Sequence, residues 1–321
     1  MMKDNMTELD VLCVGTALID SMICGFDPQP VSAAGFRARS SELFPGGEAV
    51  NVSVAAAKLG LKSGIFCRLG QDTAGDMVVR ELENHGVDVG RILRSADVPT
   101  PVTTMFVDEK GDRRSITNLA HAHNFHPEAH PERMKGARAV VLGSLFRAPF
   151  NDVEVLKKTV DILREERGLL FADTKLPNFS PLSLEDVAIV LPYLDCITPN
   201  EAEAAAFTGK ETPEEMGEVF LHYGARRVVI KLGERGCYYC DHETNFFVPG
   251  FSVATVDATG AGDNFMAGLL SEVLGGASIK EALLFANACG AICATAVGAG
   301  VGLKSREQVE ALLQAQKPQD A

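Results

Sequence analysis

The residues of this chain best suited to chemistry lie in a short glycine-rich segment that begins at Asp257 and ends at Asp263. The segment reads Asp-Ala-Thr-Gly-Ala-Gly-Asp and precedes an apolar run with helical spacing. A glycine-rich turn that opens a helix leaves backbone N–H groups unpaired beside the positive end of the helix dipole, so Gly260, Ala261 and Gly262 form a candidate anion site. Asp263 would repel a bound phosphate, but it can take the proton of a hydroxyl. Together these groups predict transfer of a phosphoryl group to a hydroxyl.

A second segment, from Gly46 to Asn51, has residue types that suit a polyol. Gly46 and Gly47 at the start of a predicted helix let a ligand approach the backbone, and the Asn51 amide offers both a donor and an acceptor to hydroxyl groups. Asp20, shortly after the first predicted strand, can accept from two hydroxyls, although an isolated aspartate there is also a common turn former. These residues predict a sugar as the acceptor.

Both segments must be positioned by an α/β framework. Strand-like apolar runs alternate with helical patterns over most of the chain, which predicts a mostly parallel central sheet with helices on both faces. Helices over Ala49–Leu59, Gly75–His85 and Asp152–Arg167 each end before a glycine suited to a left-handed cap. The predicted strands are Val11–Gly15, Ile65–Leu69, Ala139–Gly143, Leu169–Ala172, Cys196–Thr198 and Arg227–Leu232.

Two stretches, residues 17–44 and 101–124, interrupt this alternation and predict a small separate β sheet. In the second, Thr103–Val107 and Arg114–Thr117 flank the turn Glu109–Asp112 as an antiparallel hairpin. A small sheet over the site would serve as a lid, because phosphoryl transfer must exclude water. Ordinary surface hairpins are the alternative. The α/β core that binds nucleotide and substrate then consists of residues 1–16, 45–100 and 125–321.

Composition and charge limit the classes of protein to which this chain could belong. The 321 residues, 46% hydrophobic and 23% charged, suit a globular protein with a substantial core. The net charge of -13 argues against a nucleic-acid partner, which would require a basic face. No apolar run approaches the ~20 residues of a membrane span, and the N-terminus is too polar for a secretory signal. We therefore expect a cytoplasmic protein with no membrane partner.

The two segments together resemble a known pair of motifs. Gly46-Gly47-x-x-x-Asn51 and Asp257-x-Thr259-Gly260-Ala261-Gly262-Asp263 are similar to the two signatures of the ribokinase-like, or PfkB, family of carbohydrate kinases. The resemblance extends from Val11 to about Val301. It implies a ribokinase-like fold with a β lid, and an ATP-dependent sugar kinase. Lids in this family often pair into a homodimer, which the apolar lid run Met105–Val107 would allow.

The resemblance also implies roles for individual residues. Asp263 matches the catalytic base, and the amides of Gly260, Ala261 and Gly262 match the anion hole around the transferring phosphoryl group. The positions that match sugar contacts are Asp20, Gly46, Gly47 and Asn51.

The same resemblance implies a nucleotide site with Mg²⁺. Asn200 and Glu203 match an Asn-x-x-Glu motif that helps to place Mg²⁺ and the phosphates. From the residues alone, the two are the N-cap and the capping-box partner of a helix. The run from Lys231 through Gly233 to Gly236 resembles a nucleotide-binding turn, in which the lysine would add a charge near the phosphates.

Two further sites are implied by the resemblance. Asn287 lies on a helix that borders the adenine in relatives. A monovalent cation, K⁺, would be held mostly by backbone carbonyls, although Gly302 stands where relatives usually supply a further hydroxyl. The positions that match this cation site are Asp257, Thr259, Cys293, Ala296 and Gly298.

The acceptor itself is left open by the sequence. Arg147 falls near an acidic sugar contact of ribokinases, and Lys175 adds a cation at the end of a neighbouring predicted strand, where open sheets bind ligands. Both favour a substrate with a carboxylate or phosphate, with surface cations as the alternative. Glu48 replaces a lysine usual in ribokinases, which disfavours ribose. The alternatives to a sugar or sugar acid are a nucleoside, a sugar phosphate, or a non-catalytic nucleotide-binding protein.

Overall fold

The computed structural model of the protein describes residues 8–25, 38–107, 113–118, 125–176 and 182–316. Its central sheet has eight strands in the order β14-β13-β12-β11-β10-β9-β1-β4. The strands from β12 to β4 pair in parallel, whereas β13 and β14 form an antiparallel edge, so the predicted mostly parallel sheet is confirmed. Their bounds are β1 Leu9–Val14, β4 Ser63–Phe66, β9 Ala137–Leu145, β10 Leu169–Thr174, β11 Cys196–Ile197, β12 Arg227–Lys231, β13 Cys237–Asp241 and β14 Asn245–Val248.

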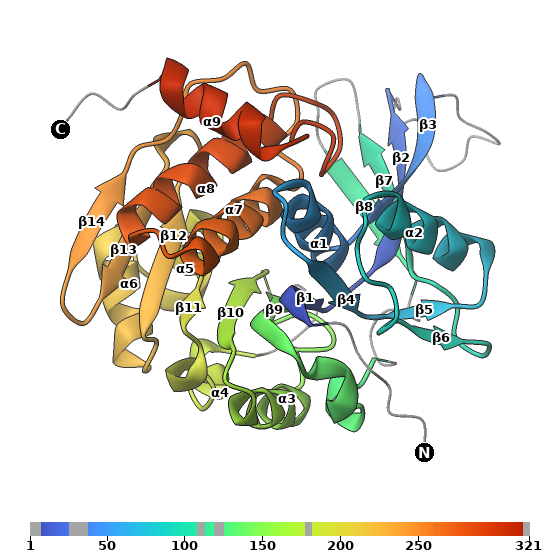
Figure 1. Ribbon diagram of the computed structural model, residues 1–321, viewed down its shortest axis with the longest axis horizontal. Helices are drawn as coiled ribbons and strands as arrows, with labels where there is room; N and C mark the ends of the chain where they lie inside the picture. Colours follow the sequence, from blue (N-terminus) through green and yellow to red (C-terminus); the bar gives the residue numbers. More distant parts are fainter. Residues whose placement is uncertain (1–7, 26–37, 108–112, 119–124, 177–181, 317–321) are drawn as a thin grey trace.

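Helices cover both faces of this sheet (Figure 1). Val11 and Cys13 of β1 pack into the core of one face, and Leu12 and Val14 pack into the core of the other, because successive side chains of a strand point to opposite sides. The first face is covered by α1 Glu48–Lys58, α2 Thr73–Asn84, α7 Ala261–Gly275, α8 Ile279–Cys293 and α9 Arg306–Ala315. The second face is covered by α3 Val153–Glu165, α4 Leu184–Val187, α5 Glu201–Thr208 and α6 Pro213–His222. In the described ranges, we find no helix with both the length and the apolar character needed to span a bilayer.

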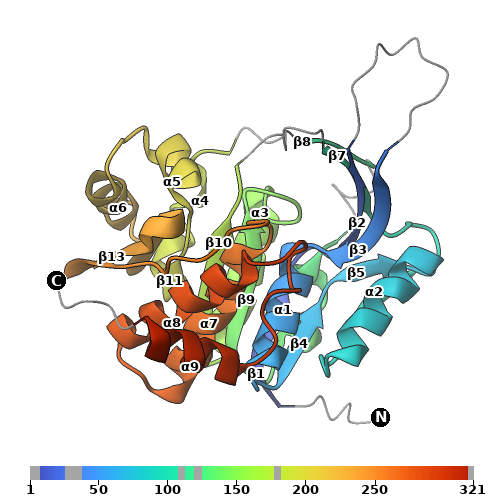
Figure 2. The same ribbon diagram turned by 90° about the horizontal axis from the view of Figure 1, so that it is seen from above.

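A separate four-stranded sheet, the lid sheet, stands beside the central one (Figure 2). It consists of β3 (Ser40–Gly46), β2 (Leu18–Cys24), β7 (Val102–Val107) and β8 (Arg113–Thr117), in that order. The predicted hairpin is confirmed, because β7 and β8 pair in antiparallel fashion; its turn, Glu109–Asp112, lies outside the described residues. Since β2 follows β1 and β3 leads directly into α1, the lid sheet is joined to the carboxyl edge of the central sheet.

One strand prediction is wrong. The run Ile65–Leu69 is not a single strand, because β4 ends at Phe66 and the chain then enters β5 (Arg68–Gly70), which pairs with β6 (Leu93–Ser95) in a small sheet of its own. The apolar pattern continues across the break, so hydrophobicity alone gives no sign of it. The side chain of Arg94, on β6, donates to the Gly70 carbonyl of β5 at 3.0 Å, which adds a side-chain contact to the pairing of these two strands.

Candidate active site

The N-terminus of α7 is the glycine-rich turn that the sequence predicts, but one of its three amides is paired, because Ala261 donates to the Ala258 carbonyl at 3.2 Å. Gly260 is the N-cap residue, with φ of 79°, a left-handed conformation that favours glycine. A Cβ at this position would lie 2.4 Å from the carbonyl oxygen of Ala299, so the backbone is packed too tightly for any side chain. Asp263 follows in the first turn and is only 6% exposed. The amides of the turn and the aspartate are therefore fixed on one rigid element.

A hydrogen bond joins this turn to the start of α1. The Asn51 side-chain amide donates to Asp263 Oδ2 at 2.6 Å, although the two residues lie 212 positions apart in the chain. Gly47, with φ of 94°, caps α1 at a point where a Cβ would lie 2.5 Å from the Thr16 carbonyl oxygen. The structure thus brings the two predicted motifs into direct contact.

Asp20 belongs to the same site from the lid side. It lies on β2 against Gly46, where a Cβ would be 2.4 Å from Asp20 Oδ2. Burial, and to a smaller extent the charge of Asp263, raise the pKa of Asp20 to about 6. The predicted sugar contacts Asp20, Gly46, Gly47 and Asn51 therefore lie together beside Asp263.

The floor of the site is acidic. Among the described residues, Glu48, Asp173 and Asp263 are buried and have carboxylate oxygens within 4.8 Å of one another. Lys231 binds both oxygens of Asp173, at 2.8 and 2.6 Å. Burial raises the pKa of Asp263, although the Lys175 charge and the Asn51 hydrogen bond oppose the shift. A carboxylate with a raised pKa is a stronger base than an ordinary aspartate.

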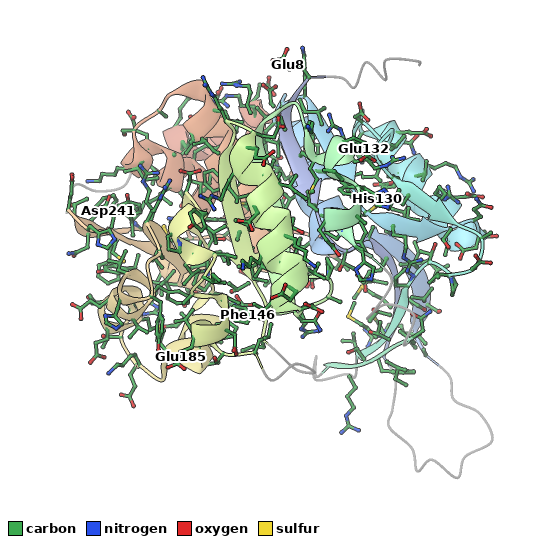
Figure 3. The ribbon with its side chains drawn as sticks, turned by 90° about the horizontal axis from the view of Figure 1, so that it is seen from below. Glu8, His130, Glu132, Phe146, Glu185 and Asp241 are labelled. Atoms are coloured by element: carbon green, nitrogen blue, oxygen red, sulfur yellow. The ribbon has the colours of Figure 1, made fainter. Side chains whose placement is uncertain are left out.

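Glu48 is held by a loop with an unusual backbone. The Ser144 hydroxyl donates to Glu48 Oε2, while Glu48 Oε1 has no hydrogen-bond partner among the described residues. Ser144 and Phe146, at the end of β9, have φ of 62° and 71°, which non-glycine residues rarely adopt. The Phe146 ring, which is labelled in Figure 3, stacks on Phe207 of α5 at 3.9 Å between centroids. Such strain is often found at functional sites.

We expect Glu48→Gln to change how stability depends on pH. Burial and, to a smaller extent, the Asp173 charge raise the pKa of Glu48 to about 8, from 4.5 for an ordinary glutamate. Between these values the folded protein holds a proton that the unfolded chain has lost, so Glu48 destabilises the fold increasingly as pH rises through that window. Glutamine keeps an acceptor for Ser144 without a charge.

Thermal melts at pH 5 to 9 measure this effect. The variant should gain stability relative to the wild type by up to about 1.4 kcal/mol per pH unit across the window. A parallel pH profile for the two proteins would contradict the assignment.

A cleft of about 910 Å³ opens beside Asp263 and is lined by the anion-site turn. The amide nitrogen of Asn287 donates to the carbonyls of Val248 and Pro249 at 3.2 and 3.1 Å, which holds one wall in place. The predicted nucleotide-binding residues that line this cleft are Asn200, Lys231, Gly233, Gly236 and Asn287.

Asn200 and Glu203 form the predicted capping box of α5. The Asn200 side chain accepts from the Glu203 amide at 2.9 Å, and the Glu203 side chain accepts from the Asn200 amide at 3.0 Å. Glu203 is only 4% exposed and also accepts from the Thr174 hydroxyl at 2.8 Å, so it links α5 to the end of β10. Burial and the Asp173 charge raise its pKa.

The residues of the predicted cation loop also come together. Asp257 Oδ2 accepts from the Gly298 amide at 3.0 Å, and the Cys293 thiol donates to the Thr259 carbonyl at 3.5 Å. Ala296 lies between Cys293 and Gly298 in the chain.

Asn264 links this loop to the anion turn, a role that the sequence did not predict. Its side-chain amide donates to the carbonyls of Gly260 and Ala299, both at 2.8 Å, from a fully buried position. The available signal was a polar residue in an otherwise apolar run directly after Asp263.

Arg147 lies beside the end of β10. Its Nε donates to the Leu176 carbonyl at 2.7 Å, and burial lowers its pKa despite the nearby charge of Glu203. The contact puts Arg147 next to the strand end that carries Lys175. A role for Arg147 toward a sugar stays a prediction.

These elements define a class of protein. A buried carboxylate lies between an anion-binding helix terminus and a set of polar groups suited to hydroxyls, at the carboxyl edge of an α/β sheet. This arrangement is that of a phosphotransferase acting on a hydroxyl group.

Comparison with known proteins supplies the family. The sequence model described as pfkB family carbohydrate kinase matches residues 9–306, and this chain belongs to that family. It is accordingly a carbohydrate kinase, a phosphotransferase with an alcohol group as acceptor, with a ribokinase-like fold.

Several relatives match over most of their length. The chain is 30% identical to 2-dehydro-3-deoxygluconokinase of Bacillus subtilis, over 83% of this chain and 86% of the relative. It is 29% identical to fructokinase-1 of Oryza sativa, over 84% and 88%. Among solved structures, a ribokinase of Thermotoga maritima superposes with a TM-score of 0.81 at 27% identity, over 95% of this chain and 99% of that one.

Proposed function

We propose that this carbohydrate kinase transfers the γ-phosphate of ATP to a hydroxymethyl group of a sugar or sugar acid, with Asp263 as the base. The observation that carries the proposal is the 2.6 Å hydrogen bond between Asn51 and Asp263. It joins the motif suited to hydroxyls to the aspartate at the anion turn, beside a cleft large enough for a nucleotide. The similarity to a sugar acid kinase and to fructokinases supports an acceptor of this class.

The reaction follows from the arrangement of these groups. Asp263 takes the hydroxyl proton as the hydroxyl oxygen bonds to the γ-phosphorus, and the bond from that phosphorus to the bridging oxygen breaks. The electron pair of the broken bond leaves with ADP. The amides of Gly260 and Gly262 stabilise the charge on the transferring oxygens, because they are already oriented by the turn. The Ala261 amide would first have to release the Ala258 carbonyl, to which it donates at 3.2 Å.

The residues at the cleft fit Mg²⁺. Asn200 lines the cleft, and Glu203, which accepts from the Asn200 backbone amide, and Asp173 lie behind it; all three offer the oxygen ligands, direct or through water, that this ion prefers. Burial, and to a smaller extent the Asp173 charge, raise the pKa of Glu203, and a bound cation would offset the second cause. When bound, Mg²⁺ would neutralise phosphate charge. A protein of E. coli described as a ribokinase II, solved with ATP and Mg²⁺, is 27% identical with a TM-score of 0.77, which supports the same pair of ligands here.

A coupled ADP-release assay tests the proposal. The purified protein would be supplied with Mg²⁺-ATP and a panel of sugars, sugar acids, sugar phosphates and nucleosides, with ADP binding measured separately by calorimetry. Turnover with a sugar or sugar acid is the expected result. Nucleotide binding without turnover on any member of the panel would contradict the proposed function. Turnover confined to nucleosides or sugar phosphates would show that the acceptor belongs to one of those classes instead.

Four finer properties complete the proposal. We propose a K⁺ site in the loop that contains Asp257 and Gly298, which activity in KCl against tetramethylammonium chloride would test. We propose a homodimer through the lid sheet, supported by Leu43 and Ile116, which are 53% and 67% exposed there, and testable by sedimentation. The proposed location is the cytoplasm, and residues 17–44 and 101–124 are proposed as the lid.

A further inference from the structure

Lys175 occupies a distinctive place at the candidate active site. It follows the last residue of β10, and its backbone amide donates to the Leu145 carbonyl at 3.0 Å, so the ends of β9 and β10 hold its backbone. The residue lines the same cleft as Gly260, Ala261, Gly262 and Asp263.

The Lys175 ammonium lies among acidic side chains but forms no hydrogen bond or ion pair with any of them. It makes no hydrogen bond and no ion pair within 4.0 Å with any residue that the structure describes. Lys231, in the same cleft, is bound by both oxygens of Asp173. Burial lowers the pKa of Lys175, but the charges of its acidic neighbours outweigh burial and raise it. These neighbours are Glu48, Asp263, Asp173 and Glu203.

Partial burial of an ammonium group costs free energy when its N–H donors have no acceptor, and a bound ligand that accepts from them removes this cost. The surrounding carboxylates keep Lys175 charged at any physiological pH, and its three N–H groups remain available. The ligand that satisfies them must be an anion that reaches the wall of the cleft beside the glycine turn. In a kinase, that anion is the group being transferred.

We propose, building on the proposed function, that the ammonium of Lys175 binds the γ-phosphoryl group during its transfer, which makes Lys175 a catalytic residue. It complements the amides of Gly260 and Gly262 as charge passes from the hydroxyl oxygen to the ADP leaving group.

Two variants and a control test this role. Lys175→Met removes the charge at similar length, Lys175→Arg keeps it, and Lys210→Met removes an exposed lysine just beyond α5. Calorimetry would compare Mg²⁺-ADP with the non-hydrolysable Mg²⁺-AMP-PNP, which differ in the γ-phosphoryl group. We expect Lys175→Met to bind AMP-PNP about tenfold more weakly with ADP binding within about twofold, and to lose 10²–10³-fold in kcat.

The other outcomes are equally informative. Lys175→Arg should retain most of the AMP-PNP preference, and Lys210→Met should match the wild type. An unchanged ratio of AMP-PNP to ADP affinity in a folded Lys175→Met protein would overturn the proposal. If that variant instead raises KM for sugar acids alone, Lys175 binds the substrate carboxylate and the proposal is wrong. Should Lys175→Met fail to fold, Lys175→Gln, which removes the charge but keeps a polar side chain, takes its place, and an unchanged ratio of AMP-PNP to ADP affinity in that variant overturns the proposal.

The two levels of the hypothesis can fail separately. Absence of turnover by the wild type on the whole panel would sink the proposed function, whereas the nucleotide comparison would still report on Lys175. Normal turnover with an unaltered AMP-PNP preference in Lys175→Met would sink only the role of Lys175.

Discussion

Asp263→Asn is expected to lower kcat by about 10²–10⁴-fold, the range that a positioned general base contributes. Asparagine has nearly the same shape and can still meet the Asn51 amide, but it cannot take the hydroxyl proton. The anion turn stays intact, because the proposed contacts of Gly260 and Gly262 with phosphate are made by the backbone. We therefore expect ADP affinity within about twofold of the wild type, measured by calorimetry beside the ADP-release assay.

Asp161→Asn is the matched control for this substitution. Asp161 lies on α3, is 51% exposed and pairs with Arg164 on the surface, so its loss should leave kcat unchanged. If the kcat of the Asp263→Asn variant is within tenfold of the wild-type value, Asp263 is not the catalytic base.

The second large effect is expected from Gly260→Ala. Alanine must adopt the left-handed conformation at φ of 79°, which costs roughly 1–2 kcal/mol. Its Cβ would also lie 2.4 Å from the Ala299 carbonyl oxygen and 2.6 Å from the Ala299 Cα, and backbone atoms cannot move aside as a flexible side chain can. The turn must shift, and kcat/KM should fall by about 10²-fold or more as the amides leave their alignment.

Gly276→Ala separates the two contributions. Gly276 caps the other end of the same helix with φ of 84°, and a Cβ there meets nothing within 4 Å. This variant should lose a similar amount of stability from the left-handed conformation and keep its kcat/KM. If both variants lose stability and neither loses activity, the anion turn does not contribute to catalysis in the way proposed.

The sequence predicted what local chemistry determines. The glycine-rich turn before α7, the hairpin of β7 and β8, and the capping box of Asn200 and Glu203 all depend on neighbours in the chain, and each has the predicted form. The family resemblance placed Asn51 and Asp263 at one site, and the structure adds their direct hydrogen bond.

The sequence did not predict the contacts between segments that are distant in the chain. The ion pair of Lys231 with Asp173 and the bond from Ser144 to Glu48 depend on how strands and helices pack, which no local pattern encodes. The break between β4 and β5 is hidden for the same reason, because a bent chain and a straight one show the same apolar alternation. The role of Asn264 is hidden too, because its buried amide connects the Gly260 turn to Ala299, which lies 35 positions further along the chain.

The 212-residue separation of Asn51 and Asp263 also has a consequence for the synthesis and folding of the enzyme. During synthesis the ribosome releases α1 long before α7, so a nascent chain holds Asn51 before Asp263 and the turn at Gly260 have been made. In the proposed mechanism, a truncated product that ends before Gly260 lacks both the base and the anion turn and therefore has no kinase activity. Activity therefore reports that synthesis has passed α7 and that the first and last parts of the chain have found each other, which makes turnover a direct readout of completed folding.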